Sequence, residues 1–230
     1  MAQFDDITEA ALGNFGLVTA AQAAEMGVRS KDIAEWVRLG RLERRGWGVY
    51  RIAHYVPSDF DRYAEAVALV GGDAAVWGES VLAMLNLALV NPLRVSVATG
   101  RRVRRRLPSW IRLVRKPRGA ETESIEGVPS QRLADAIREC RGRVMADRLA
   151  DAVREAGRKG LLGAGDARKL ERELRRNAAG SSPTASARPG RRPSWRVPNG
   201  VPPTKPLWRP CRTGPESFPP PTKPLPGRTT

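Results

Sequence analysis

Basic side chains gather in three short stretches whose composition suits contacts to nucleic acid. The first holds Arg29, Ser30 and Lys31, at the start of an expected helix. Arginine and lysine can donate to the acceptor atoms of guanine, and serine can contact a base or a phosphate. We therefore predict that these three residues, with Glu35 as a further candidate, contact base edges of double-stranded DNA.

The second stretch holds Arg44, Arg45 and Arg51, on either side of the sequence Gly46-Trp47-Gly48. Two short runs joined by glycines predict a β-hairpin. Guanidinium groups on this hairpin would reach backbone phosphates or the minor groove. The side chain of Trp47, at the tip of this hairpin, could lie against a sugar of the DNA or fold back onto the domain.

The third stretch lies between two expected strands, 94–99 and 111–115. It contains the arginines Arg101, Arg102, Arg104, Arg105 and Arg106. The run is expected to be an exposed connection. It could extend the phosphate contacts, since each neutralised phosphate adds to a salt-dependent affinity. Alternatively, the run could bind an acidic partner protein, or it could be a solvated loop with no binding role.

The elements that would position the first two stretches are typical of a winged helix. A helix over 4–14 precedes two short helices, 20–26 and 31–39, and the hairpin over 42–52. Thr19 with Gln22 has the pattern of a capping box, Ser30 is expected to cap the second helix of the pair, and Gly40 has the place of a C′ glycine. Residues 1–56 are therefore predicted to form a winged-helix domain, whose 31–39 helix would enter the major groove.

The rest of the chain divides into a mixed segment and a tail. Residues 57–177 are expected to form an α+β domain. Its predicted helices cover 61–69, 79–88, the region from Ser130 and 166–176, and its predicted strands cover 74–77, 94–99 and 111–115. Residues 178–230 are expected to be a disordered basic tail, because 14 of the 19 prolines lie in 177–230. Three roles are possible for this tail. It could add non-specific affinity for DNA, it could be a Pro-rich ligand for a partner, or it could have no dedicated role.

Net charge alone is a weak argument for a nucleic-acid partner. The formal charge is +16, but residues 1–56 carry seven basic and seven acidic side chains, whereas 177–230 carry nine basic and one acidic. A neutral winged helix can still have a basic face if its acids lie on the opposite side. Winged helices also serve as protein-docking modules, and that alternative stays open.

Several function classes are poorly supported by the composition. Cys140, Cys211 and His54 are the only cysteines and histidine, too few for a disulfide scaffold or a zinc site. We predict no catalytic residues, no metal and no cofactor, and hence no enzyme. Asp59-Phe60-Asp61 has D-x-D spacing, but it also fits a helix N-cap cluster, and Cys140 fits a small core residue. No apolar run reaches the roughly 18 residues that would span a bilayer, so we expect a cytoplasmic protein without a membrane partner.

The chain resembles AbiEi-type antitoxins of type IV toxin–antitoxin systems. The resemblance rests on the runs 16–28, 32–44 and 48–51, and downstream on 61–66, 79–92 and 94–97, so it covers roughly 5–176. It does not extend to the tail.

This resemblance implies an antitoxin and autorepressor whose winged helix binds inverted repeats in its operator. It also implies a second domain that counteracts a nucleotidyltransferase-like toxin. The residues implied for DNA contact are those chosen above, namely Arg29, Ser30, Lys31, Arg44, Arg45 and Trp47. A plain winged-helix transcription regulator without a toxin partner is the alternative.

Overall fold

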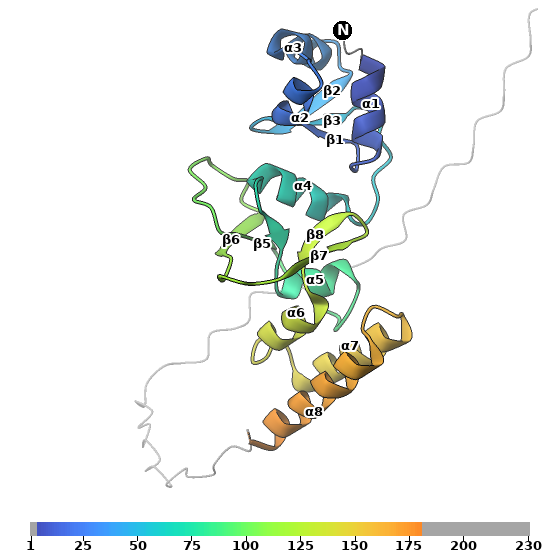
Figure 1. Cartoon of the computed structure of the whole chain (residues 1–230), viewed down its shortest axis with the longest axis vertical. Helices are drawn as coiled ribbons and strands as arrows, with labels where there is room; N and C mark the ends of the chain where they lie inside the picture. The colour runs from blue at the N-terminus through green and yellow to red at the C-terminus, as the bar shows by residue number, and fades with distance from the viewer. Residues whose placement is uncertain (1–3, 181–230) are drawn as a thin grey trace, which may run out of the picture. The chain divides into compact units, whose positions relative to one another are not determined.

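The computed structural model describes residues 4–180, with side chains from 4 to 176 (Figure 1). Most of the expected tail, from residue 181 onward, lies outside the described residues, as does Cys211. The N-terminal elements are α1 (Phe4–Leu12), β1 (Leu17–Thr19), α2 (Ala20–Glu25), α3 (Ser30–Arg38), β2 (Leu42–Gly46) and β3 (Val49–Ile52). This is the element order of a winged helix.

Local capping explains where the two short helices begin. The Thr19 hydroxyl accepts from the backbone N–H of Gln22 at 3.2 Å, and the Gln22 side chain accepts from the Thr19 N–H at 2.9 Å. This confirms the predicted capping box. The prediction that Ser30 caps α3 is wrong by one residue, because Arg29 is the N-cap and Asp32 accepts from its N–H at 3.4 Å.

Strand β1 is too short for a sequence pattern to predict, and it adds a third strand to the hairpin. It pairs antiparallel with β3, which places β3 between β1 and β2. Strand β2 has a bulge, because Arg44 is paired with Tyr50 and Gly46 with Val49, which leaves Arg45 as the extra residue. Beneath this sheet lies a small core of Ile7, Ala11, Val18, Ala23, Val28, Ile33, Leu42 and Ile52.

The second part of the chain is built on a mixed sheet with strand order β6-β5-β4-β8-β7. Its strands are β4 (Ala75–Val76), β5 (Val95–Thr99), β6 (Ile111–Arg115), β7 (Thr122–Ile125) and β8 (Val128–Gln131). β5 runs parallel to β6 and β4 runs parallel to β8, whereas the other neighbours are antiparallel. Together with its helices this sheet confirms the α+β class.

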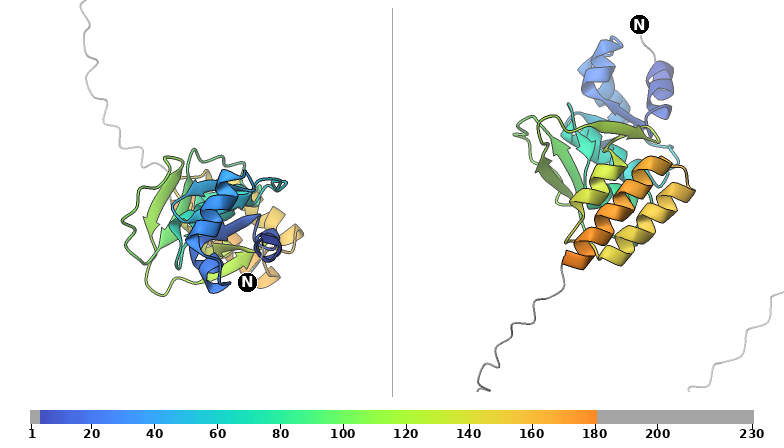
Figure 2. Two further views of the ribbon diagram at one scale, coloured as in Figure 1. Left: turned by 90° about the horizontal axis from the view of Figure 1, so that it is seen from above. Right: turned by 60° about the horizontal axis from the view of Figure 1, so that its bottom comes forward.

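Helix α4 (Asp61–Val70) packs on strands β4, β5 and β8 and also contacts β1. Helices α5 (Glu79–Met84), α6 (Leu133–Glu139), α7 (Ala146–Arg158) and α8 (Ala164–Gly180) complete this part. Figure 2 shows α7 and α8 side by side, and α6 also contacts α8. The larger core, formed mainly by aliphatic side chains, includes Leu82, Leu87, Val97, Ile137, Leu149 and Leu170.

Four features of this part differ from what the sequence predicts. The β7–β8 hairpin was missed because its strands lack apolar alternation; it turns at Glu126 and Gly127, whose φ angles are 48° and 83°. The helix expected over 79–88 ends at Met84, since the backbone becomes left-handed at Asn86 and Ala88.

The helix expected from Ser130 begins only at Leu133, because Ser130 belongs to β8. Its apolar stripe is divided between α6, which ends at Glu139, and α7. Helix α8 also continues to Gly180, so residues 178–180, which were assigned to the tail, are helical.

Candidate nucleic-acid interface

The first turn of α3 presents basic side chains that are exposed. Arg29 Nε and Nη2 donate to the two carboxylate oxygens of Asp32 at 2.9 Å and 3.1 Å. The arginine keeps 57% of its side chain exposed. This hydrogen bond is the main cause that lowers the pKa of Asp32 and raises the pKa of Arg29. The pairing fixes the plane of the guanidinium and leaves its Nη1–Nη2 edge open.

Ser30 and Lys31 are also exposed, and Lys31 forms no ion pair with any described residue. Glu35, an inconvenient acid for a DNA-facing helix, is paired with Arg38 at 2.6 Å one turn later. The charge of Glu35 is therefore compensated on the same helix. The structure brings Arg29, Ser30 and Lys31 together in a single turn, as the sequence predicted, although their contact with DNA stays a prediction.

On the hairpin, the three arginines have different surroundings. Arg44 is exposed, and its Nε donates to the Gly46 carbonyl at 3.4 Å. Arg45 donates twice to the Glu65 carboxylate of α4, at 3.1 Å for both bonds, and lies 3.7 Å from Glu43. Arg44 is therefore available to a ligand, whereas Arg45 is largely committed to α4.

Arg51 is largely buried and faces α4, and its contact with DNA stays an untested prediction. Only 11% of its side chain is exposed, and its Nη2 lies 3.2 Å from Asp61 Oδ2 and 3.3 Å from Glu65 Oε2. Because the guanidinium faces two carboxylates of α4, we leave Arg51 out of the proposed interface. The sequence alone did not reveal Asp61 and Glu65 as partners of Arg51. Their i, i+4 spacing, which places both on one face of α4, was the available signal.

Asp61 also fits the interpretation of the D-x-D sequence as a helix N-terminal cluster. Its Oδ1 accepts from the Ser58 N–H at 2.8 Å and from the Ser58 hydroxyl at 2.6 Å. Asp59 is exposed. Within residues 4–180, no group of His, Cys, Asp and Glu side chains could hold a metal ion.

Trp47 protrudes from the hairpin tip with 73% of its surface exposed, so it does not fold into either core. The backbone beside it is tightly packed, because a Cβ added to Gly46 would overlap Leu69 Cδ2. The hairpin tip is therefore supported by α4 while its indole faces outward.

The arginine run forms the crossover between the parallel strands β5 and β6, as an exposed connection. Arg105 is tied to the fold, since its Nη2 donates to the Val70 carbonyl at 2.5 Å. The run lies beside the hairpin tip: Trp47 lines one hollow with Arg101, Arg102, Arg104 and Arg105.

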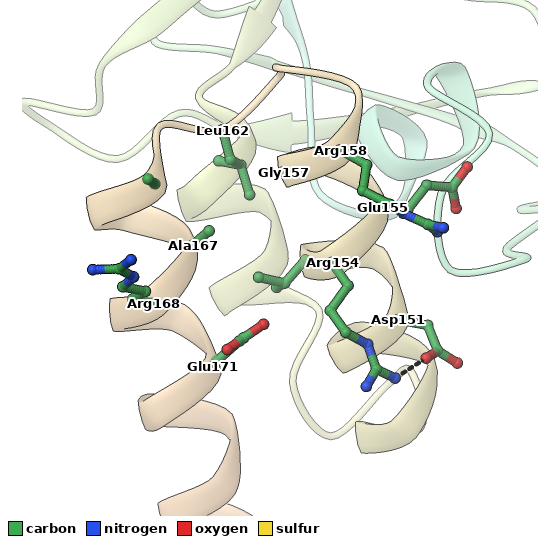
Figure 3. A pocket seen from close by; sticks show the side chains of 11 residues that line it. Asp151, Arg154, Glu155, Gly157, Arg158, Leu162, Ala167, Arg168 and Glu171 are labelled. Atoms are coloured by element: carbon green, nitrogen blue, oxygen red, sulfur yellow. Dashed lines mark hydrogen bonds and ion pairs between the residues drawn. The ribbon is translucent and has the colours of Figure 1, made fainter.

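A larger groove of about 720 Å³ runs between α7 and α8. Its rim carries both signs of charge, and Figure 3 shows Arg154 paired with Asp151 on α7. Leu162 and Ala167 supply apolar lining. Mixed charge of this kind does not favour a polyanion.

Cys140 is fully buried, as the sequence predicted, and burial raises the pKa of its thiol to about 12. A thiol that stays protonated and inaccessible is a core residue rather than a nucleophile. In the part of the chain that the structure describes, no helix is long and apolar enough to cross a membrane.

Comparison with known families gives a match over the N-terminal elements. Residues 5–53 match the family model described as "Transcriptional regulator, AbiEi antitoxin". These residues are similar to that family, and we call them the AbiEi-type domain. The match covers α1 through β3, so the AbiEi-type domain includes α3 and the hairpin with their exposed basic residues.

Beyond this domain the comparisons add little. A solved structure, the crystal structure of the RV2827C protein from Mycobacterium tuberculosis, shares 15% identity over 72% of this chain and 79% of that chain, with a TM-score of 0.34. A TM-score this low carries no conclusion about fold or function. No curated protein matches the chain.

Proposed function

We propose that this protein is the antitoxin of a type IV toxin–antitoxin operon and represses that operon by binding inverted repeats in its operator. One observation carries the proposal: the AbiEi-type domain presents exposed Arg29, Ser30 and Lys31 on the first turn of the second helix of its helix-turn-helix. In winged-helix proteins this turn meets base edges in the major groove. The proposal places the protein in the cytoplasm and requires no catalytic residue.

The hairpin supports the same interface. Arg44 and Trp47 are exposed, and they follow α3 along the chain. The hairpin that carries them belongs to the three-stranded sheet β1-β3-β2. Guanidinium groups at a wing bind phosphates, which fix register but carry no base information. We therefore assign base contacts to α3 and backbone contacts to Arg44, with Arg45 contributing only if it leaves Glu65.

We further propose that residues 57–180 act on a nucleotidyltransferase-like toxin, while 1–56 binds DNA and 181–230 adds a basic segment. The resemblance of 61–66, 79–92 and 94–97 to AbiEi antitoxins supports this division. A plain transcription regulator without a toxin is the second candidate, and it is favoured by the restriction of the family match to 5–53.

DNA binding is tested by gel shift with the DNA upstream of the gene. Arg29→Ala and Lys31→Ala should each weaken operator binding by about 1–3 kcal/mol if the side chain contacts a base. Arg154→Ala is a matched control, because Arg154 is also exposed and paired with a helical aspartate three residues away. Equal affinities for the three variants would overturn the assignment to α3.

The antitoxin role is tested by co-expression with an adjacent nucleotidyltransferase gene. Growth that is arrested by that gene and restored by the full chain supports the proposal. Absence of such a gene, or no rescue by a folded chain, favours the plain regulator.

A further inference from the structure

A hollow of about 320 Å³ lies beside the hairpin tip. Its lining joins two segments that are far apart in the sequence: the indole of Trp47 and the side chains of Arg101, Arg102, Arg104 and Arg105. Pockets for small ligands start at about this volume. The hollow therefore has a size suited to one small molecule, and it is not part of the α3 surface assigned to base contacts.

Three of the arginines that line this hollow have no carboxylate partner among the described residues. Arg101, Arg102 and Arg104 form no ion pair with any carboxylate in the described part of the chain. The acid that follows α4, Asp73, accepts from the Thr99 hydroxyl at 2.5 Å and from the Gly100 N–H at 3.0 Å. Arginines that are concentrated at a concave surface attract anions, and the guanidinium fork matches phosphate oxygens.

The fold holds the backbone at the start of the run and the side chain of Arg105. Asp73 anchors the start of the run, and the Arg101 N–H donates to the Thr99 hydroxyl at 3.1 Å. Gly72, with φ +69°, lets the backbone approach Arg101 closely, since an added Cβ would lie 3.1 Å from Arg101 Cδ. Arg105 closes the other side through the Val70 carbonyl. This organisation lowers the entropy lost when an anion binds.

The exposed indole at the same hollow adds a planar surface. A nucleobase can stack on an aromatic side chain, and such contacts contribute about 1–3 kcal/mol per base. Arginines for phosphates and a ring for a base together match a nucleotide. We propose that the hollow lined by Trp47 and the arginine run binds a nucleoside triphosphate, with its phosphates on Arg102 and Arg104 and its base against Trp47.

Phosphates of duplex DNA share part of this chemistry. However, the bases of a duplex stack on one another and are not available to the indole. A concave site with a ring therefore favours a free nucleotide over the DNA backbone. The hollow shares Trp47 with the hairpin of the proposed DNA interface, but this inference does not depend on the operator contacts proposed for α3.

The test is isothermal titration calorimetry of the full chain at physiological salt with ATP, GTP and inorganic tripolyphosphate. We expect saturable binding of at least one nucleotide, weakened about tenfold or more by Arg104→Ala because a charge-assisted bond is lost. Arg106→Ala is the matched control, since Arg106 is exposed in the same run but does not line the hollow. Trp47→Ala should lower nucleotide affinity to that of tripolyphosphate and leave tripolyphosphate binding unchanged.

Several outcomes would overturn the proposal. These are no saturable binding of either nucleotide, equal effects of Arg104→Ala and Arg106→Ala, or no effect of Trp47→Ala. Weaker binding of Arg104→Ala to a scrambled duplex, without nucleotide binding by the parent chain, would assign the hollow to DNA phosphates instead. Circular dichroism of each variant checks that the fold is retained, and the operator gel shift reports separately on α3.

Discussion

Arg51 of β3 and Asp61 of α4 form an ion pair whose Nη2 and Oδ2 atoms lie 3.2 Å apart, with 11% and 6% of their side chains exposed. Arg51 Nε, Arg51 Nη2 and Asp61 Oδ2 have no hydrogen-bond partner among the described residues. Glu65 Oε2 lies 3.3 Å from Arg51 Nη2, and the Glu65 carboxylate also accepts a hydrogen bond from Arg45. Two arginines of the AbiEi-type domain are thereby joined to one helix of the following segment.

Removing Arg51 should destabilise the fold strongly. Arg51→Met leaves the Asp61 and Glu65 carboxylates buried without that cation, and breaking a buried pair from one side costs about 3–5 kcal/mol. Urea denaturation measures the loss. Arg29→Ala, which removes an exposed pair, should cost far less, because exposed ion pairs contribute little to stability. A loss no larger than that of Arg29→Ala would show that the buried pair contributes little.

Replacing Gly46 tests the contact between the hairpin and α4. Gly46→Ala should cost about 1–3 kcal/mol, because the new methyl group overlaps the buried Leu69 side chain. Gly163→Ala is the control, since an added Cβ there meets no atom within 4 Å. Gly46→Ala should cost less unfolding free energy in a Leu69→Ala background than in the parent chain. If the two costs are equal, the overlap is not the cause.

Asp32 is predicted to sharpen operator selection without touching DNA itself. Asp32→Ala frees the Arg29 guanidinium, so ordering that side chain on DNA should cost about 0.5–1.5 kcal/mol more. Loss of a negative charge should at the same time strengthen binding to any duplex. The ratio of operator to scrambled-DNA affinity, measured by competition gel shift, should therefore fall. Asp151→Ala on α7 is the control, and an unchanged ratio for Asp32→Ala contradicts the prediction.

Acid stability should depend on Glu173 of α8. Its carboxylate accepts from Arg138 Nε at 3.0 Å and from Arg141 Nη2 at 2.6 Å, and these bonds lower its pKa. A depressed folded-state pKa stabilises the fold above the ordinary glutamate pKa of about 4.3. This stabilisation is lost as the pH falls through the lower folded-state pKa.

Glu173→Gln should therefore reduce unfolding free energy at neutral pH and flatten its decline in acid. Glu171→Gln, on the same helix and without an ion pair to a described residue, is the control. Chemical denaturation between pH 3 and pH 7 follows both variants. Parallel pH profiles for Glu173→Gln and the parent chain would rule out this contribution.

The sequence predicted the elements that carry strong local signals. Thr19 with Gln22 and Gly40 marked real helix ends, and alternation identified β5 and β6. The β7–β8 hairpin has polar strands, so its pairing depends on tertiary context and a left-handed turn rather than on apolar period.

The candidate site shows the same limit. Arg29 and Lys31 could be chosen because helix position alone decides their exposure. The sequence could not show that Arg51 is buried while Arg44 is exposed. The burial of Arg51 depends on its pairing with Asp61 and Glu65 of the next helix. The hollow beside Trp47 combines two distant segments, and spacing along the chain does not reveal such a juxtaposition.

The bulge in β2 has a further consequence for neighbouring arginines. Because Arg45 is the extra residue, it reaches Glu65 while Arg44 stays exposed. A one-residue deletion at Arg45 would restore regular alternation and bring Arg44 next to Gly46. The length of this strand, rather than the identity of either arginine, thus directs Arg45 to a carboxylate of α4 and leaves Arg44 without an ion pair to a described residue. Variants of this hairpin would tolerate Arg-to-Lys exchange far better than a change in residue count.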